Sequence, residues 1–438
     1  MPEQQNIEWK ASWRDEYLKW ICGFANAKGG ILIIGKDDNG EIIGVEDYKK
    51  LMDEIPNKIQ NHLGIVCDVN LKQHDNLYYI EIEVEQYPFA VNYKGQYHYR
   101  VGSTKQELKG ASLDKFLLKK QGKCWDSVPI PNISVKDLNE KTLQIFRKKA
   151  INSKRLNDEI LNDDNEILIE KLNLYENNQL KRAAILLFFS NPEKFITGAY
   201  VKIGYFETDD DLRYQDEIHG NIFEQIEQTL SVLKSKYLKA YISYNGIERV
   251  EDYIFPESAI REAILNAICH KDYGSNTPIQ ISVYANKIIF FNCGELPENW
   301  TIEKLREKHP SKPYNPDIAN TLFWAGYIET WGRGTIKMIN ECKKSGKMPP
   351  IYRYDFSGIL VEFYSYSEID LKNKGLKDWQ IKIILYIQNK GAITNTEIQK
   401  LCNVSKRTAS TYLSELESIY IEKTGTTGKG TTYTLKGQ

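Results

Sequence analysis

The pattern of apolar and polar residues near the N-terminus changes from a helical period to a strand period. Apolar residues recur at helical spacing over 17–24, which predicts a helix that ends in the glycine-rich segment 26–30. The next four residues, Ile31–Ile34, are all aliphatic and suit a buried strand. The start of the chain therefore predicts a domain that mixes helices and strands.

Residues typical of tight turns predict further strands in this domain. The segment Asp37–Gly40 is typical of a tight hairpin, with a returning strand over Glu41–Val45. A further strand pair is expected over Tyr78–Val84 and Tyr97–Val101, and the polar segment after residue 125 reads as a linker. We therefore place an α/β domain at residues 1–125.

The middle of the chain divides into two regions on the same grounds. Residues 126–250 carry Pro129 and Pro131 and read as a linker with a connecting α/β region. From Pro256 the pattern becomes a helix, a pair of strands and a glycine-rich loop, closed by a strand over Ile359–Tyr364. We therefore expect a second α/β domain at residues 251–366.

The C-terminal segment, residues 376–438, has the pattern of a helix-turn-helix with a strand pair. An amphipathic helix over Lys377–Asn389 precedes Thr394 and Glu397, which are spaced as a helix capping box. A second and third helix would follow, and strands near Ile419–Glu422 and Thr431–Leu435 would supply a wing.

Composition narrows the class of protein. The seven cysteines lack zinc-site spacing and read as reduced thiols, and no segment is apolar enough to span a membrane. We therefore expect a cytoplasmic protein without a membrane partner. The net charge is −1, yet residues 372–438 hold eleven Lys and Arg against five Asp and Glu, which indicates an appended nucleic-acid-binding module.

Acidic residues near the N-terminus form a candidate hydrolytic site. Glu8 and Lys10 share one face of an extended segment, Asp38 lies in the hairpin turn, and Glu3 could join them if the chain bends near Pro2. Three carboxylates can hold Mg²⁺ or Mn²⁺ and activate water, while Lys10 would stabilise phosphate charge. The alternative is structural: Asp38 suits any hairpin, and Glu8 with Lys10 could be a solvated strand pair.

The same residues carry a family resemblance. The segments Glu3-x4-Glu8-x-Lys10, Phe24–Asp38 and Tyr99–Thr104 together resemble the Schlafen/AlbA-like domain. The resemblance implies a divalent-metal site at Glu3, Glu8 and Asp38 that cleaves transfer RNA. It also implies a surface loop in which Arg100, Ser103 and Thr104 bind phosphate. Schlafen nucleases clamp RNA between two lobes, so a homodimer would have to supply the second lobe here.

A predicted helix from residue 258 to 273 aligns Glu262, Asn266 and His270 on one face. The segment is similar to the GHKL-type ATP-binding domain, an α/β sandwich. That resemblance implies that Asn266 holds Mg²⁺ and Glu262 orients the attacking water, with Gly294, Gly332 and Gly334 near the nucleotide. Asn292 stands where the family has the adenine-reading aspartate, so ATP binding and a purely structural role both remain open.

The C-terminal pattern resembles a winged-helix domain. Ala409, Leu413 and Leu416 are expected to pack inward. Nucleic-acid contacts would then come from the opposite face and the wing, at Lys406, Arg407, Ser410, Thr411 and Lys429. Duplex DNA is the expected partner, and a protein-binding module is the alternative.

Two functions of different classes follow. The first is a metal-dependent endoribonuclease of Schlafen type, acting on transfer RNA or other RNA, with a role in antiphage defence. The second is a DNA-binding transcriptional regulator whose middle domain senses ATP or another ligand and which has no nuclease activity. The carboxylates and Lys10 favour the first, whereas the winged helix favours the second.

Overall fold

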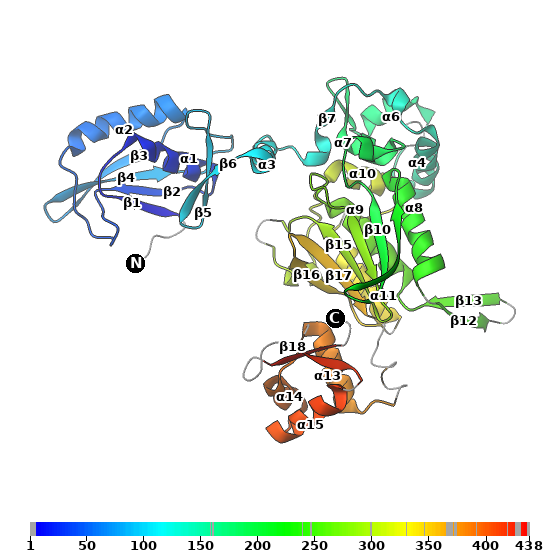
Figure 1. The fold of residues 1–438 in the computed structure, drawn as a ribbon. Coiled ribbons are helices and arrows are strands. Elements are labelled where there is room, and N and C mark those ends of the chain that lie inside the picture. Colours follow the sequence, from blue (N-terminus) through cyan, green and yellow to red (C-terminus); the bar gives the residue numbers. More distant parts are fainter. Residues whose placement is uncertain are drawn as a thin grey trace. The chain divides into compact units, whose positions relative to one another are not determined.

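The computed structural model describes most of residues 6–435. Outside the described residues lie 1–5, 158, 160–161, 239, 246–247, 298–299, 330, 346, 365–370, 372–374, 391, 418, 425–430 and 436–438; for 240–245, 248–252 and 388–389 only the backbone is described. The chain divides into two compact units, Met1–Cys124 and Trp125–Gln438. Figure 1 shows the fold of each unit.

The first unit is built on a four-stranded sheet in the order β1-β2-β4-β3. Strand β1 is parallel to β2, whereas β4 is antiparallel to both of its neighbours. The strands are β1 (Ile7–Lys10), β2 (Gly30–Ile34), β3 (Asp68–His74) and β4 (Leu77–Val84). The parallel β1–β2 pair places Glu8 beside Leu32 and Lys10 beside Ile34, so these four side chains share one face of the sheet.

Two helices, α1 (Leu18–Asn26) and α2 (Tyr48–Leu63), cover that face. Alternate residues of β2 and β4, among them Leu32 and Ile82, are fully buried against them because side chains of a strand alternate between its faces. A hairpin of β5 (Tyr97–Val101) and β6 (Thr104–Leu108) lies against α1, and helix α3 (Gly110–Lys120) follows it.

Two strand predictions in this unit are wrong. Tyr97–Val101 pairs with residues 104–108 and not with Tyr78–Val84, which is an inner strand between β2 and β3. The segment Glu41–Val45 makes only an isolated bridge, Lys36 to Ile42, after the turn. Short-range turn signals located the turns but could not show which distant strand each segment joins.

The middle of the second unit contains a six-stranded sheet in the order β11-β10-β14-β15-β17-β16, in which only β10 and β14 are parallel. Its strands are β10 (Val201–Thr208), β11 (Asp211–Ile218), β14 (Ile279–Val283), β15 (Lys287–Cys293), β16 (Ile351–Asp355) and β17 (Gly358–Tyr364). A three-stranded sheet, β7-β9-β8, and a separate β12–β13 hairpin accompany it. These strands are β7 (Pro129–Ile130), β8 (Tyr175–Glu176), β9 (Gln179–Lys181), β12 (Ala240–Asn245) and β13 (Glu248–Tyr253).

Helices from both predicted halves of this region pack into one core, which runs from Val135 to Phe363. They are α4 (Glu140–Ser153), α6 (Asn165–Lys171), α7 (Arg182–Phe188), α8 (Ile222–Val232), α9 (Glu257–His270), α10 (Pro316–Trp324) and α11 (Gly334–Lys344); a π-helical turn, Leu233–Tyr237, extends α8. The boundary expected between residues 250 and 251 is therefore corrected. Strand β10 lies before that boundary, β14 lies after it, and the two strands pair directly.

The C-terminal part has the winged-helix fold that the sequence predicts. Its elements are α13 (Asp378–Lys390), α14 (Asn395–Cys402), α15 (Lys406–Glu417), β18 (Ile421–Thr424) and β19 (Thr432–Leu435). The side chain of Thr394 accepts from the backbone N–H of Glu397, and the Glu397 carboxylate accepts from the backbone N–H of Thr394, which confirms the capping box. In the described part of the chain no helix combines the length and apolarity needed to cross a membrane.

Candidate functional sites

The Glu8 carboxylate lies buried at the centre of a cluster of charges in the first unit. Lys10 Nζ donates to one carboxylate oxygen at 2.5 Å, and Arg100 Nη1 donates to the other at 2.8 Å. Side-chain exposure is 2% for both Glu8 and Arg100, so this ion pair is removed from water. Breaking such a pair by removing one partner typically costs about 3–5 kcal/mol.

Arg100 therefore differs from its expected role. It was placed on a surface loop that binds phosphate, but it lies on strand β5 and is buried, because its guanidinium pairs with Glu8 and lies over the rings of Trp20 and Phe24. Ser103 and Thr104 are exposed at the tip of the β5–β6 hairpin, with Thr104 Oγ1 donating to the carbonyl of Val101.

The metal site inferred from the resemblance is only partly described. Glu3 lies outside the described residues, and no group of three His, Cys, Asp or Glu side chains in the described part of the chain could hold a metal ion. The hairpin that carries Asp38 packs on the opposite face of the sheet from Glu8, since its Gly40 and Lys36 lie against the Trp9 ring. Both oxygens of Glu8 already contact cations, so Glu8 fits a metal only after Lys10 or Arg100 releases it.

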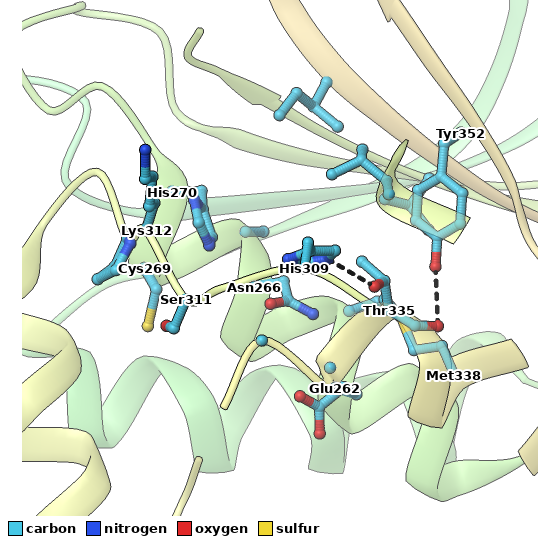
Figure 2. A pocket seen from close by; sticks show the side chains of 18 of the residues that line it. Glu262, Asn266, Cys269, His270, His309, Ser311, Lys312, Thr335, Met338 and Tyr352 are labelled. Carbon is cyan, nitrogen blue, oxygen red and sulfur yellow. Dashed lines mark hydrogen bonds between the residues drawn. The ribbon is translucent and has the colours of Figure 1, made fainter. Parts of the chain in front are cut away.

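Helix α9 supplies one wall of a pocket in the second unit, shown in Figure 2. As the helical spacing predicts, Glu262, Asn266 and His270 all line it. Burial, and secondarily the charge of His309, lowers the pKa of His270 to about 4, so its ring is neutral near pH 7. Apolar side chains, among them Trp300 and Tyr352, make up much of the remaining wall.

The first turn of α11 lies directly on Glu262 and Asn266. A Cβ atom built on Gly334 would come within 2.7 Å of Glu262 Oε1 and 3.0 Å of Asn266 Nδ2, and Lys337 Nζ lies 3.2 Å from Glu262 Oε2. There is no room between these groups for a phosphate or a hydrated Mg²⁺. The cavity volume, about 110 Å³, is also below the roughly 300–1,000 Å³ of sites that enclose drug-sized ligands, so only a much smaller ligand would fit. ATP therefore does not fit the residues as they are arranged.

The other glycines expected near a nucleotide have structural roles. Gly332 has φ +64°, and a Cβ there would lie 2.1 Å from the carbonyl oxygen of His309. A Cβ on Gly294 would lie 2.6 Å from the carbonyl oxygen of His270. Both positions thus allow two backbone segments to approach closely. His309, which Gly332 approaches, also makes the hydrogen bond from its Nε2 to Thr335 Oγ1 that Figure 2 shows.

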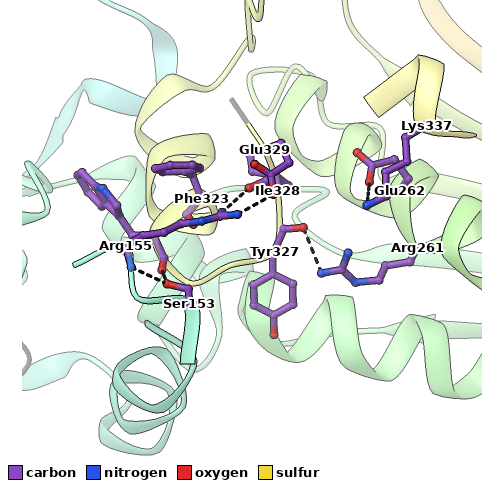
Figure 3. Close-up of polar contacts among 10 residues, drawn as sticks. Ser153, Arg155, Arg261, Glu262, Phe323, Tyr327, Ile328, Glu329 and Lys337 are labelled. Carbon is purple, nitrogen blue, oxygen red and sulfur yellow. Dashed lines mark hydrogen bonds and ion pairs between the residues drawn. The ribbon is translucent and has the colours of Figure 1, made fainter. Parts of the chain in front are cut away.

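Arg155, which the sequence did not single out, holds another part of the pocket wall (Figure 3). Its Nη1 donates to the carbonyls of Phe323 and Ile328, both at 2.7 Å, and its Nη2 donates to Glu329 at 2.6 Å. Arg261 of α9 donates to the neighbouring carbonyl of Tyr327. These contacts fix the segment after α10 and so position Ile328 and Glu329 in the pocket wall. Bonds to backbone carbonyls leave no sequence signal.

The winged helix presents a polar face on α15. Ala409, Leu413 and Leu416 are buried, as predicted, while Lys406, Arg407, Ser410 and Thr411 are all exposed. Ser410 and Thr411 donate to the helix carbonyls of Lys406 and Arg407, respectively. Lys429 of the predicted wing lies outside the described residues.

A mixed α/β chain that ends in a winged helix with an exposed basic face belongs to the class of multidomain nucleic-acid-binding proteins. Comparison with known families agrees. Residues 3–109 match the family "Schlafen, AlbA_2", residues 276–363 match a family described as "ATP-dependent DNA helicase recG C-terminal", and residues 378–419 match "Winged helix-turn-helix DNA-binding". The chain thus combines three segments that are similar to a Schlafen AlbA_2 domain, a RecG C-terminal domain and a winged helix-turn-helix, respectively.

Whole-chain comparisons add little to this assignment. The crystal structure of the DIP2311 protein from Corynebacterium diphtheriae covers 98% of this chain and 91% of its own, at 17% identity and a TM-score of 0.47. That level of similarity carries no argument about function. The comparison with curated proteins found no match.

Proposed function

We propose that this protein is a DNA-binding regulator that reads duplex DNA with helix α15. The observation that carries the proposal is the division of α15 into a buried apolar face and an exposed face with Lys406, Arg407, Ser410 and Thr411. A helix of this kind, the second of a helix-turn-helix, enters the major groove with its N-terminal residues toward the base edges. Lys406 and Arg407 begin α15, and Arg is suited to bidentate contacts with guanine.

The pocket beside α9 supports the regulatory part of the proposal. It is too small for a nucleotide as arranged, but Asn266 Nδ2 is buried in it and has no hydrogen-bond partner among the described residues. A small, largely apolar ligand with one acceptor group would satisfy this donor. We therefore assign ligand sensing to the middle domain without ATP hydrolysis.

Binding of the protein to a duplex DNA of selected sequence tests the proposal. After a preferred site is enriched from random duplexes, Arg407→Ala should weaken binding to it roughly 10- to 100-fold, because one good base contact contributes about 1–3 kcal/mol. Lys382→Ala is the matched control, since Lys382 is an exposed cation on α13, outside the helix-turn-helix. Equal dissociation constants for Arg407→Ala and the unaltered protein would remove α15 as the reading helix.

A second function, metal-dependent cleavage of RNA, is favoured by the Schlafen AlbA_2 match and by the contact of Glu8 with Lys10. It requires Glu8 to leave its cation partners and to join residues 3 and 38 around Mg²⁺ or Mn²⁺, with a homodimer supplying the second RNA-binding lobe. Total RNA, transfer RNA included, incubated with Mn²⁺ or with chelator tests it. Cleavage that needs the metal and is lost in Glu8→Gln would support it, and intact RNA under all conditions would rule it out.

A further inference from the structure

The six-stranded sheet of the second unit has two edge strands, β11 and β16, and they differ in how they are protected. Strand β11 pairs irregularly with β10 around Phe206, and it carries three acidic residues against one arginine. Bulges and charges of this kind keep an edge strand from pairing with another chain. Strand β16 keeps an unbroken register with β17, and its outer edge has no hydrogen-bonded neighbour among the described residues.

The exposed part of β16 carries one cation and one anion on the same side of the strand. Arg353 and Asp355 lie on that side and Tyr354 on the other, because side chains alternate along a strand. Arg353 donates from Nε and Nη2 to the buried carboxylate of Glu362, yet its side chain remains 51% exposed. Among the described residues Asp355 makes no ion pair, and its Oδ1 accepts from the backbone N–H of Phe356. Both charges can therefore reach a partner strand.

The turn after β16 holds an exposed aromatic residue in a strained backbone conformation. Phe356 has a φ of +51° and Ser357 a φ of +57°, in the left-handed region that suits Asn or Gly and is unfavourable for Phe. Phe356 is 77% exposed, so packing within the chain does not offset this strain. The turn is held in place by the carbonyl of Ser357, which accepts from the backbone N–H of Gly294 at 3.2 Å. Backbone strain of this kind clusters at binding sites.

The charges of β16 are complementary to those of a second β16 strand that runs antiparallel to it. With Tyr354 on a two-fold axis, Arg353 of each copy faces Asp355 of the other, and symmetry makes this ion pair occur twice. A register centred on Arg353 or on Asp355 instead places like charges opposite each other, which is destabilising. The register centred on Tyr354 also brings that side chain, 45% exposed, against its own counterpart and places Phe356 opposite Tyr352 of the other copy.

We propose that β16 pairs antiparallel with β16 of a second copy of this chain, with Tyr354 on the two-fold axis, and so joins two six-stranded sheets into one. The pairing supplies hydrogen-bond partners to the outer backbone groups of both edge strands. A pair of five-residue strands buries little area, so the dimer is weak and depends on protein concentration. The inference goes beyond the proposed function and does not rest on it, because α15 lies in the winged helix.

Disulfide cross-linking of the full chain tests the register. Residues directly opposite each other in an antiparallel pair have Cβ atoms about 4.5–5.5 Å apart, close to the separation that a disulfide spans. The Tyr354→Cys protein should therefore form a covalent dimer under mild oxidation, seen on non-reducing gels. Tyr214→Cys, at an exposed tyrosine of β11, and the unaltered protein with its seven cysteines are the controls, and both should stay monomeric.

Sedimentation velocity over a series of micromolar concentrations measures the dissociation constant of the dimer. Asp355→Lys places a lysine opposite Arg353 on both sides of the axis, so this constant should rise about tenfold or more. Asp211→Lys makes the same charge change on β11 and should leave the constant unchanged. Phe356→Asn removes the ring but suits the left-handed backbone, so it should weaken the dimer while raising the denaturant midpoint, whereas a misfolded variant would have a lower midpoint.

The outcomes separate this inference from the α15 proposal. A monomer at every concentration would overturn the inference, and so would a dimer that Tyr354→Cys does not cross-link and Asp355→Lys does not weaken, whatever Arg407→Ala does on DNA. A dimer with the expected response to both variants supports the inference, even if Arg407→Ala binds the selected duplex as the unaltered protein does and the α15 proposal fails.

Discussion

The side-chain carboxyl group of Asp126, in the second unit, is fully buried. One of its oxygens accepts from the backbone N–H groups of Asp317 and Ile318, while the other is buried and has no partner in the part of the chain that the structure describes. Burial, reinforced by the charge of Asp317, raises the pKa of Asp126 to about 7, although the two N–H donors and Lys181 oppose the shift. The folded protein therefore binds this proton more tightly than the unfolded chain does.

This shift predicts a pH-dependent stability. Because the folded pKa is raised, the contribution of Asp126 is fully present below pH 4 and is lost as the pH rises through 7. The shift corresponds to up to about 4 kcal/mol. Asp126→Asn keeps an acceptor for the two N–H groups without the charge, so it should gain stability over the unaltered protein between pH 4 and pH 8. Urea unfolding at pH 4 and at pH 8 measures the free energy of unfolding of both proteins. If the difference between the two proteins does not grow from pH 4 to pH 8, the raised pKa of Asp126 is refuted.

Residue positions in the N-terminal unit could be predicted only where they depend on local geometry. Strand alternation correctly placed Glu8 and Lys10 on one face, and they are in contact. The partner that buries Glu8 is 92 residues away on β5. Its approach depends on the space left by Gly23, which a single sequence does not reveal, and Arg100 was therefore assigned to the surface.

The start of helix α11 depends on two glycines with different surroundings. A Cβ on Gly332 would meet the backbone carbonyl of His309 at 2.1 Å, and its φ of +64° is unfavourable for other residues. A Cβ on Gly334 would meet the ends of the Glu262 and Asn266 side chains, which can move. Position 334 should therefore tolerate an added methyl group better than position 332.

We expect Gly334→Ala to destabilise the second unit by about 1–3 kcal/mol and Gly332→Ala to destabilise it by more, because overpacking adds to backbone strain there. Gly375→Ala is the control: its φ is +75°, but none of the described residues lies within 4 Å of a Cβ there, so only the strain of about 1–2 kcal/mol applies. Denaturant midpoints rank the three variants. A midpoint for Gly332→Ala no lower than that of Gly375→Ala would contradict the close approach.

Elements were predicted best where the signal is local. The capping box of α14 and the apolar stripe of α15 both occur as expected, since each depends on residues within a few turns. The pocket residues of α9 share a face for the same reason. Their cover by α11 could not be predicted, because residues 262 and 334 meet only through the tertiary fold.

At the scale of the whole molecule, the long-range β10–β14 pair decides how many domains the middle of the chain contains. Five consecutive partners, Val201 with Ile279 through Tyr205 with Val283, join the two predicted regions in one sheet. Helices α8 and α9 also come from different predicted regions and share one core. Periodicity along the chain describes each segment but carries no information about such pairing, which explains the misplaced boundary.

This arrangement makes a prediction about fragments. A fragment of residues 125–364 keeps the whole six-stranded sheet and should unfold in one cooperative transition. A fragment of residues 251–366 lacks β10 and β11, so the core face of β14 and the inner side of α9 would be exposed to solvent. This fragment should therefore show no near-ultraviolet circular dichroism and no sharp thermal transition. Residues 1–124, which have their own core, provide the positive control for independent folding. Cooperative unfolding of fragment 251–366 at the midpoint of fragment 125–364 would restore a domain boundary near residue 250.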